Sequence, residues 1–264
     1  LTSAASTEFI SVASGNFGTA STWDVNAVPT SLDNITIMPG HTVTINASSQ
    51  AAYNVTVNGT LEYGSTPTSF AVNNNLTVNS GGLVNVFNGT TGKTLTVAGN
   101  ITNNGTMNIS VGATSAGNLT FNGSGVQTLS GSGTFTNNVI RNVIFSNTST
   151  ALPNINWLVN NLSVEYNLNI TNAKINLGGN KFTYGTGITT ATAGNTFTVT
   201  GGGFMNGTFS RWWTNGGTGL VSAATSLATG SAGRYPFYTP DGQLRLFYIG
   251  RTTPTAGGQY SVTY

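Results

Sequence analysis

The acidic residues of this chain are its first candidates for chemistry. Cleavage of a polysaccharide needs clustered acids, or acids that hold Ca²⁺ beside a basic residue. The sequence offers six: Glu8, Asp24, Asp33, Glu62, Glu165 and Asp241. Asp24, Asp33 and Glu62 are the three that could converge and hold calcium, whereas Asp24 and Asp33 could also accept backbone N–H groups within a cap. The sequence therefore predicts no catalytic residue, no enzyme and no cofactor, with these three carboxylates as the calcium alternative.

The aromatic run Arg211-Trp212-Trp213 is the best candidate for contact with a ligand. Sugars lay their C–H faces on aromatic rings that stand beside polar groups, so this run suits a glycan. In the alternative, one tryptophan plugs the end of the preceding structure and the other packs under a following module. The sequence leaves both alternatives open.

A repeated pattern of polar, apolar, Thr and apolar residues determines the elements that must position these side chains. It returns at steps of 19 to 24 residues, in segments 34–37, 54–58, 75–79, 94–97, 118–122, 142–145, 161–164 and 181–184. Such a period is typical of a solenoid in which each turn, or rung, contacts only its neighbours. We therefore predict an all-β fold, a right-handed parallel β-helix (β-solenoid) with about 21 residues per rung and eight rungs over about 40 Å.

Alternation within each segment predicts which side chains face the interior, because successive strand residues point to opposite sides. The expected interior pairs are Ile35/Ile37, Val55/Val57, Leu76/Val78, Leu95/Val97, Leu119/Phe121, Val143/Phe145, Leu162/Val164 and Phe182/Tyr184. The Asn and Thr residues between them should face outward, where Asn amides of successive rungs can bond to one another. Glycines at 59, 81, 82, 105, 178 and 179 should supply the positive φ angles of the corners.

The same register argues against a catalytic pair of carboxylates. Glu62 and Glu165 would lie about five rungs apart, roughly 24 Å, whereas paired glycosidase carboxylates lie within about 10 Å. The single histidine, His41, shares parity with Val43 and Ile45, so it should point toward the edge of the core. A catalytic triad or a metal cluster around His41 is therefore not expected.

Composition excludes several partners. Eight basic and six acidic residues make up 5% of the 264 residues, and the net charge is +2. This balance provides no electrostatic surface for nucleic acid or anionic lipid. There is no cysteine and no long apolar run that would cross a membrane. The chain starts at Leu1 without a methionine, which indicates a processed or excised piece.

Three parts are predicted along the chain. Residues 1–33 form an N-terminal cap in which Trp23, Phe9 and Phe17 seal the open end of the core. Residues 34–200 form the rungs. Residues 201–264 form a partial β-sandwich module, rich in aromatic residues, with strands at 243–248 and 259–264. Because the last strand is still under way at Tyr264, the module is expected to be truncated.

The outward threonines suggest a second surface. Thr36, Thr56, Thr77, Thr96, Thr120, Ser163 and Thr183 would form a ladder along the rod, and flat threonine arrays can bind ice. Ile144 interrupts this ladder, and rung lengths vary. Threonine is also simply a favourable residue for an exposed strand, which explains the ladder without a ligand.

Both ends of the chain resemble a known group of proteins. Residues 21–24, 28–30, 33–37 and 39–45, and later 207–211, 233–237 and 243–246, are similar to the repeat regions of large secreted cell-surface proteins of Bacteroidota. These are exported by the type IX route and include gliding-motility adhesins. The first of these segments also resembles G8 domains. The resemblance implies an extracellular location, an adhesive or scaffold role, and export machinery as a partner; it carries over no catalytic residue.

The function expected from the sequence is therefore that of a non-enzymatic segment of an exported cell-surface protein, an adhesin or structural scaffold. The first alternative is a carbohydrate-binding or polysaccharide-processing β-helix module, with extracellular glycans or surfaces as partners. Ice binding by the solenoid is the third hypothesis.

Overall fold

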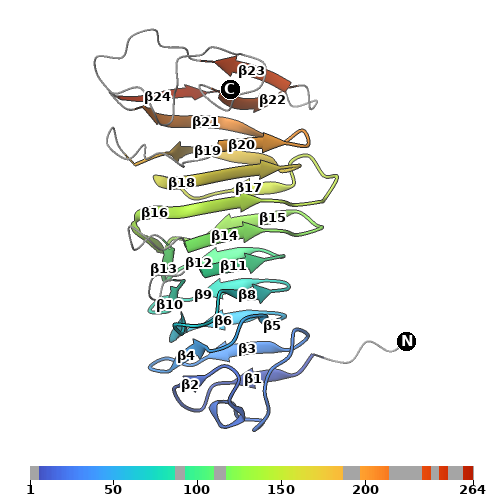
Figure 1. Cartoon of the computed structure of the whole chain (residues 1–264), viewed down its shortest axis with the longest axis vertical. Coiled ribbons are helices and arrows are strands. Elements are labelled where there is room, and N and C mark those ends of the chain that lie inside the picture. Colours follow the sequence, from blue (N-terminus) through green and yellow to red (C-terminus); the bar gives the residue numbers. More distant parts are fainter. Residues whose placement is uncertain are drawn as a thin grey trace.

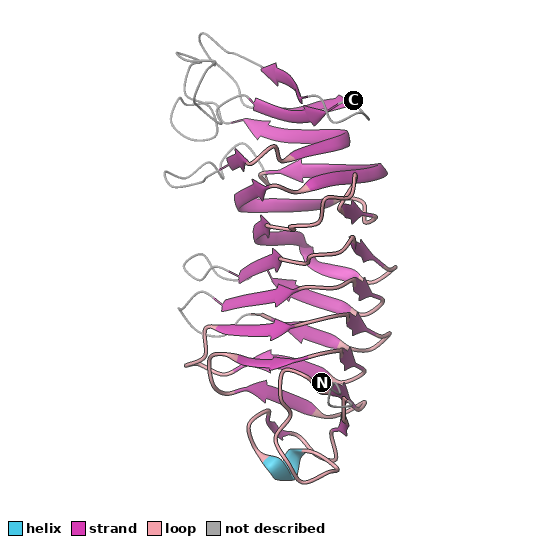
Figure 2. Ribbon diagram, turned by 90° about the vertical axis from the view of Figure 1, so that its right-hand side faces the viewer, coloured by secondary structure: helices cyan, strands magenta, loops and turns pink. Residues whose placement is uncertain are grey.

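The computed structural model describes residues 6–86, 93–109, 117–186, 197–213, 234–238, 244–248 and 258–263. Strands stack one above another along the long axis of the molecule and form a parallel β-solenoid of about eight turns (Figures 1 and 2). The described residues contain a single helical turn, η1 (Ala20–Thr22). No helix in those ranges is long and apolar enough to cross a membrane.

The strands stack in three columns, which we call A, B and C. Column A contains β1 (Glu8–Ile10), β3 (Asn34–Ile37), β6 (Val55–Val57), β9 (Leu76–Val78), β12 (Ile101–Asn103), β15 (Gln127–Ser130), β17 (Ile155–Trp157) and the first parts of β19 (Lys174–Tyr184) and β21 (Phe204–Trp213). Column B contains β2 (Gly15–Asn16), β4 (Thr42–Ile45), β7 (Thr60–Tyr63), β10 (Leu83–Asn85), β13 (Thr106–Ile109), the first parts of β16 (Thr134–Phe145) and β18 (Leu162–Thr171), and the second parts of β19 and β21. Column C contains β5 (Gln50–Ala52), β8 (Ser69–Val72), β11 (Lys93–Val97), β14 (Gly117–Phe121), the second parts of β16 and β18, and β20 (Phe197–Thr200).

The rung does not have a constant length of about 21 residues. In column A, Ile35 pairs with Val55 and Val55 with Leu76, steps of 20 and 21 residues, but Leu76 pairs with Ile101 and Ile101 with Leu129, steps of 25 and 28. The eight segments of the predicted repeat lie in different columns: the first three in A, the next three in C and the last two in B. Strands of all three columns bury one face, so they share one local pattern, and the pattern alone does not distinguish the columns.

The predicted parity of the strands is confirmed. All sixteen residues of the eight expected interior pairs are at most 1% exposed. Thr56 and Thr77, between them, are partly exposed. A one-residue shift would have inverted this arrangement, so alternation identifies the interior side chains of these segments. Two residues that were expected to be exposed are nevertheless covered, because Asn142 is 2% and Thr183 4% exposed.

Close approach of successive rungs accounts for several corner glycines. Positive φ angles occur at Gly81, Gly178 and Gly179, as expected, but not at the glycines at 59, 82 and 105. A Cβ atom at Gly82 would meet the carbonyl oxygen of Val57 in the rung below. These corners therefore require glycine because a side chain has no room, and not because of the backbone angle.

The N-terminal residues close one end of the core. Trp23 and Phe17 are each 1% exposed and Phe9 is 5% exposed. The Trp23 ring lies edge-on to both phenylalanines, with centroids 6.2 Å from Phe9 and 5.7 Å from Phe17. The Trp23 Nε1–H donates to the carbonyl of Phe17 at 2.9 Å. The aromatic seal expected at this end is thus present, and β1 and β2 within it already stack on the first full rung.

Parallel stacking continues past residue 200 at the other end. β21 pairs in parallel with β19 over both columns A and B. Antiparallel pairing then begins: β24 (Gly258–Thr263) lies along β21, and β22 (Arg234–Tyr238) pairs with β23 (Leu244–Tyr248). The two C-terminal strands expected from alternation are therefore present, whereas the module boundary at 201 and the sandwich architecture remain predictions.

Candidate functional site

Asp33 acts within the N-terminal cap. Its Oδ2 accepts hydrogen bonds from the Thr30 N–H at 2.8 Å and the Thr30 hydroxyl at 2.6 Å, and its Oδ1 accepts from the Thr7 N–H at 3.1 Å. Burial acts to raise the pKa of Asp33, but these three hydrogen bonds outweigh it and hold the pKa below its usual value. The carboxylate is therefore used to fix a loop on β1.

The other two calcium candidates lie in separate environments. Asp24 Oδ1 accepts the Ile10 N–H at 2.9 Å, and the Asp24 N–H donates to the Ile10 carbonyl at 2.9 Å, so Asp24 closes the outer edge of β1. Glu62 Oε1 accepts from the Thr44 hydroxyl at 3.3 Å in column B. Within the described ranges no three His, Asp or Glu side chains form a group that could hold a metal. The structure thus does not join Asp24, Asp33 and Glu62 in one site.

Two basic side chains also serve the structure. His41 is partly buried, and its Nδ1 lies 2.9 Å from the Ser11 hydroxyl, at the contact between the cap and the first rung. Lys93 is 1% exposed, and its Nζ donates to the carbonyls of Ser65 at 2.7 Å and Pro67 at 2.6 Å. Burial lowers the pKa of Lys93. Its neighbours are backbone carbonyls that its ammonium group fixes in place.

Arg211 lies inside the last turn. It is 2% exposed, and its guanidinium carbon stands 5.5 Å from the ring centroid of Tyr184 and 5.3 Å from that of Phe197. Such stacking on aromatic rings is favourable for a cation removed from water. Arg211 is therefore a core residue, while Trp212 is only half-buried and the side chain of Trp213 lies outside the described part of the chain. The ligand contact predicted for this run now rests on the two tryptophans.

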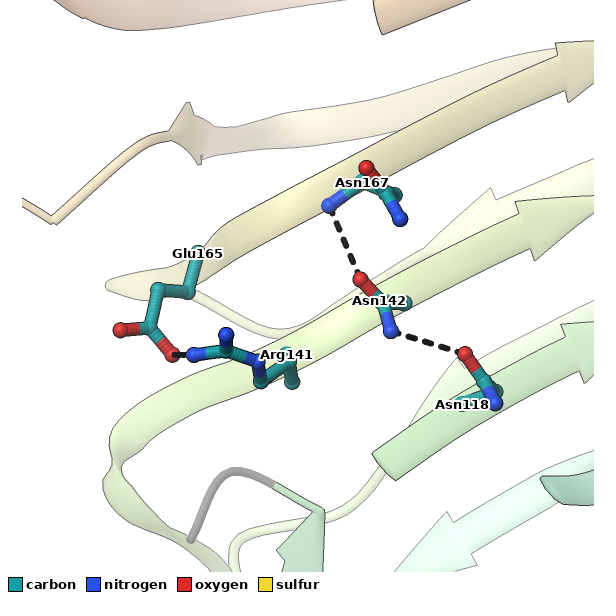
Figure 3. A network of polar contacts seen from close by, with 5 residues as sticks. All are labelled: Asn118, Arg141, Asn142, Glu165 and Asn167. Atoms are coloured by element: carbon teal, nitrogen blue, oxygen red, sulfur yellow. Dashed lines mark hydrogen bonds and ion pairs between the residues drawn. The ribbon is translucent and has the colours of Figure 1, made fainter. Parts of the chain in front are cut away.

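Asparagine side chains connect neighbouring rungs, as alternation predicted. In column C, Asn142 Nδ2 donates to Asn118 Oδ1 at 2.8 Å, and Asn142 Oδ1 accepts the Asn167 N–H at 3.0 Å (Figure 3). Beside this ladder, Arg141 binds Glu165 at 3.1 Å, which is the one ion pair among the described residues. Glu165 is thus paired with a cation, and within the described ranges it belongs to no group of three or more acidic or histidine side chains.

A shallow depression lies on the outer surface of column A. Its volume is about 360 Å³. It crosses four strands and is lined by Glu8, Asn34, Ile35, Asn54, Val55, Thr56, Asn75 and Thr77. The sequence predicted the outward Asn and Thr residues, but not that Glu8 stacks on Asn34, because residues 1–33 were expected to form only a cap. The alternation of Glu8 with buried Phe9 was the signal that would have shown it.

The outward threonines do not form one ladder. Thr36, Thr56 and Thr77 follow one another in column A, and Thr96 and Thr120 are neighbours in column C. Ser163 and Thr183 are neighbours in column B, where Thr183 is buried. Column A instead continues from Thr77 to Thr102 and Ser130. The array on which the ice-binding hypothesis was based is therefore divided among three faces.

Comparison with protein families gives one match. Residues 22–133 match the G8 domain. The matched segment begins in η1 and ends after β15, so the G8-like character expected for the cap extends over the early turns. The match covers less than half of the chain. Neither the curated proteins nor the solved structures contain a match to this chain.

Proposed function

We propose that this chain is a non-enzymatic segment of an exported cell-surface protein, in which it acts as an adhesin or structural scaffold. One observation carries the proposal: a single apolar core runs from Phe9 in the first strand to Phe209 and Phe237 near the other end. Successive rungs are joined by strand pairing throughout the described residues, so the molecule can hold two partners at a fixed separation. A rod of this kind offers long outer faces instead of a closed active site.

The distribution of charged groups supports a role without catalysis. Asp24 and Asp33 bind backbone groups, and Glu165 binds Arg141. The variant Asp24→Asn/Asp33→Asn/Glu62→Gln tests this part of the proposal. We expect the purified wild-type chain to leave polysaccharides intact. Cleavage by the wild type that disappears in the triple variant would contradict a non-enzymatic role.

The finer assignment rests on the resemblance of the chain ends. We propose that the parent protein belongs with the Bacteroidota surface proteins that use type IX export and include gliding adhesins, and that residues 201–264 belong to a sandwich-like module. A G8-like segment over residues 22–133 is compatible with this assignment. Extracellular surfaces or glycans would be the partners in that setting.

Location is tested on cells that produce the parent protein. Antibodies raised against this chain should label intact cells, and a cytoplasmic protein probed in the same sample should become visible only after permeabilisation. Labelling of this chain only after permeabilisation would contradict the surface role.

The scaffold role is tested in solution. Small-angle X-ray scattering should show an elongated particle. Its length should equal the number of stacked rungs multiplied by about 4.8 Å, together with the two ends. A compact or flexible particle would contradict a spacer function, whatever the location of the protein.

A further inference from the structure

The depression on column A contains polar groups that the protein itself does not use. Glu8 Oε1 accepts the Thr36 hydroxyl at 2.7 Å, which leaves Oε2 of the same carboxylate without a partner among the described residues. The hydroxyl groups of Thr56 and Thr77 likewise have no hydrogen-bond partner in that part of the chain, and both residues line the depression. Three polar groups therefore face the same shallow space.

The asparagines around these groups are held in fixed positions. Asn54 Nδ2 donates to Asn34 Oδ1 at 2.8 Å, and Asn54 Oδ1 accepts the Asn75 N–H at 3.1 Å. Asn75 Oδ1 in turn accepts the Asn100 N–H at 2.8 Å. Because the ladder fixes these side chains before any ligand arrives, little side-chain entropy is lost when the surface binds.

The backbone beneath the depression is already occupied. β6 pairs with β3 on one side and with β9 on the other. An extended peptide that binds by adding a strand needs unpaired N–H and C=O groups at a sheet edge, and this face has none within β6. Recognition here must therefore use the side-chain hydroxyl, amide and carboxylate groups.

We infer that this depression binds a neutral saccharide chain that lies along the solenoid axis. Sugar hydroxyl groups both donate and accept, so they can donate to Glu8 and exchange hydrogen bonds with Thr56 and Thr77. The Glu8 carboxylate disfavours an acidic chain, because a like charge would be placed beside it. Thr56 and Thr77 stand one rung apart, about 4.8 Å, so one extended chain can reach both.

The affinity of the site should be low, and each sugar residue that contacts the depression should add a small contribution to it. Its lining includes no aromatic ring, so the contacts are hydrogen bonds to a wet surface, each with a small net contribution. We expect a dissociation constant of about 1 mM for a short oligosaccharide. This inference does not depend on the scaffold proposal, because the particle shape and the saccharide affinity are measured separately.

The test compares two faces of the same chain. The variant Thr56→Val/Thr77→Val removes two hydroxyl groups from the depression but keeps β-branched side chains. The matched control Thr96→Val/Thr120→Val makes the same change at two stacked, partly exposed positions of column C. Titration with cellohexaose, followed by amide NMR shifts, should give about tenfold weaker binding for the first variant, as expected for two hydrogen bonds. The control should remain within about twofold of the wild type.

Charge preference gives the second readout. Hexagalacturonate, the acidic probe, should bind the wild type less tightly than cellohexaose, and Glu8→Gln should reduce that difference. The inference is overturned if cellohexaose shows no saturable binding, if both double variants lose affinity equally, or if hexagalacturonate binds the wild type more tightly. Thermal unfolding of each variant shows whether its fold is retained before the affinities are compared.

Discussion

The early turns, from β3 to β13, and the late turns, from β16 to β21, build the same solenoid in different ways. Early strands contain three to five residues and are separated by corners, whereas the four long late strands contain 10 to 12 residues and pass through two columns without interruption. Asn137, Asn138, Gly178 and Gly179 have positive φ angles within these late strands, which is where the strands turn.

The cores differ as well. Column A of the early turns is aliphatic, with Ile35, Val55, Leu76 and Ile101 stacked in register. A continuous series of rings starts at Phe121 in β14 and passes through the late turns by way of Phe145, Trp157, Phe182 and Phe209, with neighbouring centroids 5.0 to 5.8 Å apart. The difference teaches that rung stacking requires only inward apolar side chains, and that their size can vary from turn to turn together with the rung length.

The largest expected effect comes from placing a charged side chain in the apolar interior of an early turn. Val78→Asp places a carboxylate at a position that is 0% exposed, without a cationic partner. We expect a loss of stability above about 4 kcal/mol, because an unpaired charge would be buried. Thr77→Asp, one residue away on the outer face, should cost far less. Equal losses in chemical denaturation would contradict the assigned parity.

A pair of tryptophan variants separates the cap from the late turns. Trp23 Nε1–H donates to the Phe17 carbonyl, whereas Trp157 Nε1 is buried without a partner among the described residues. Trp23→Phe should therefore lose about 1 to 3 kcal/mol more than Trp157→Phe, because only the first change breaks a hydrogen bond. Urea unfolding of both variants measures the difference. A larger loss for Trp157→Phe would show that ring packing outweighs hydrogen bonding here.

Two asparagines compare a buried ladder with an exposed one. Asn142 in column C is 2% exposed, and Asn54 in column A is partly exposed. Asn142→Ala should cost about 1 to 3 kcal/mol, since it leaves the groups of Asn118 and Asn167 without their partner. Asn54→Ala should cost less, because water can replace the lost bonds. Equal losses would mean that the ladders contribute independently of burial.

The smallest expected effect concerns the ion pair of the late turns. The side chains of Arg141 and Glu165 are 14% and 24% exposed. Glu165→Gln should change the free energy of unfolding by under about 1 kcal/mol at low salt, and by less as salt screens the charges. Arg141 also stacks 4.7 Å from the Tyr166 ring centroid, which should remain in this variant. A large, salt-independent loss would point to a structural role for the Glu165 carboxylate beyond charge.

Alternation predicted the interior of every rung because it depends only on strand geometry. The same alternation applies to two charged residues. Lys93 has the parity of Leu95 and Val97, and Arg211 has the parity of Phe209, so the pattern places both side chains inward despite their charge. The chemical identity of Arg211 suggested a ligand contact, and that suggestion outweighed the pattern.

The rung length and the assignment of strands to columns could not be predicted in the same way. They depend on which strands pair across a corner, and a corner can be a short turn, as at Gly82, or a bend within a strand, as at Asn137 and Asn138. The depression of column A depends on the same register, because it places Glu8 beside Asn34. Long-range pairing of this kind leaves no mark in a local pattern.

The direction of the hydrogen bonds between rungs determines how the molecule would respond to a pulling force. The β1 strand lies near one end of the molecule and β24 near the other (Figure 1). Tension applied between these ends therefore acts along the bonds that join successive rungs. Bonds loaded in that direction break a few at a time, beginning at an end, because each rung contacts only its neighbours. A rung of 20 residues would release about 70 Å of extended chain. The solenoid would thus lengthen in steps under load, and refold by adding rungs to those that remain.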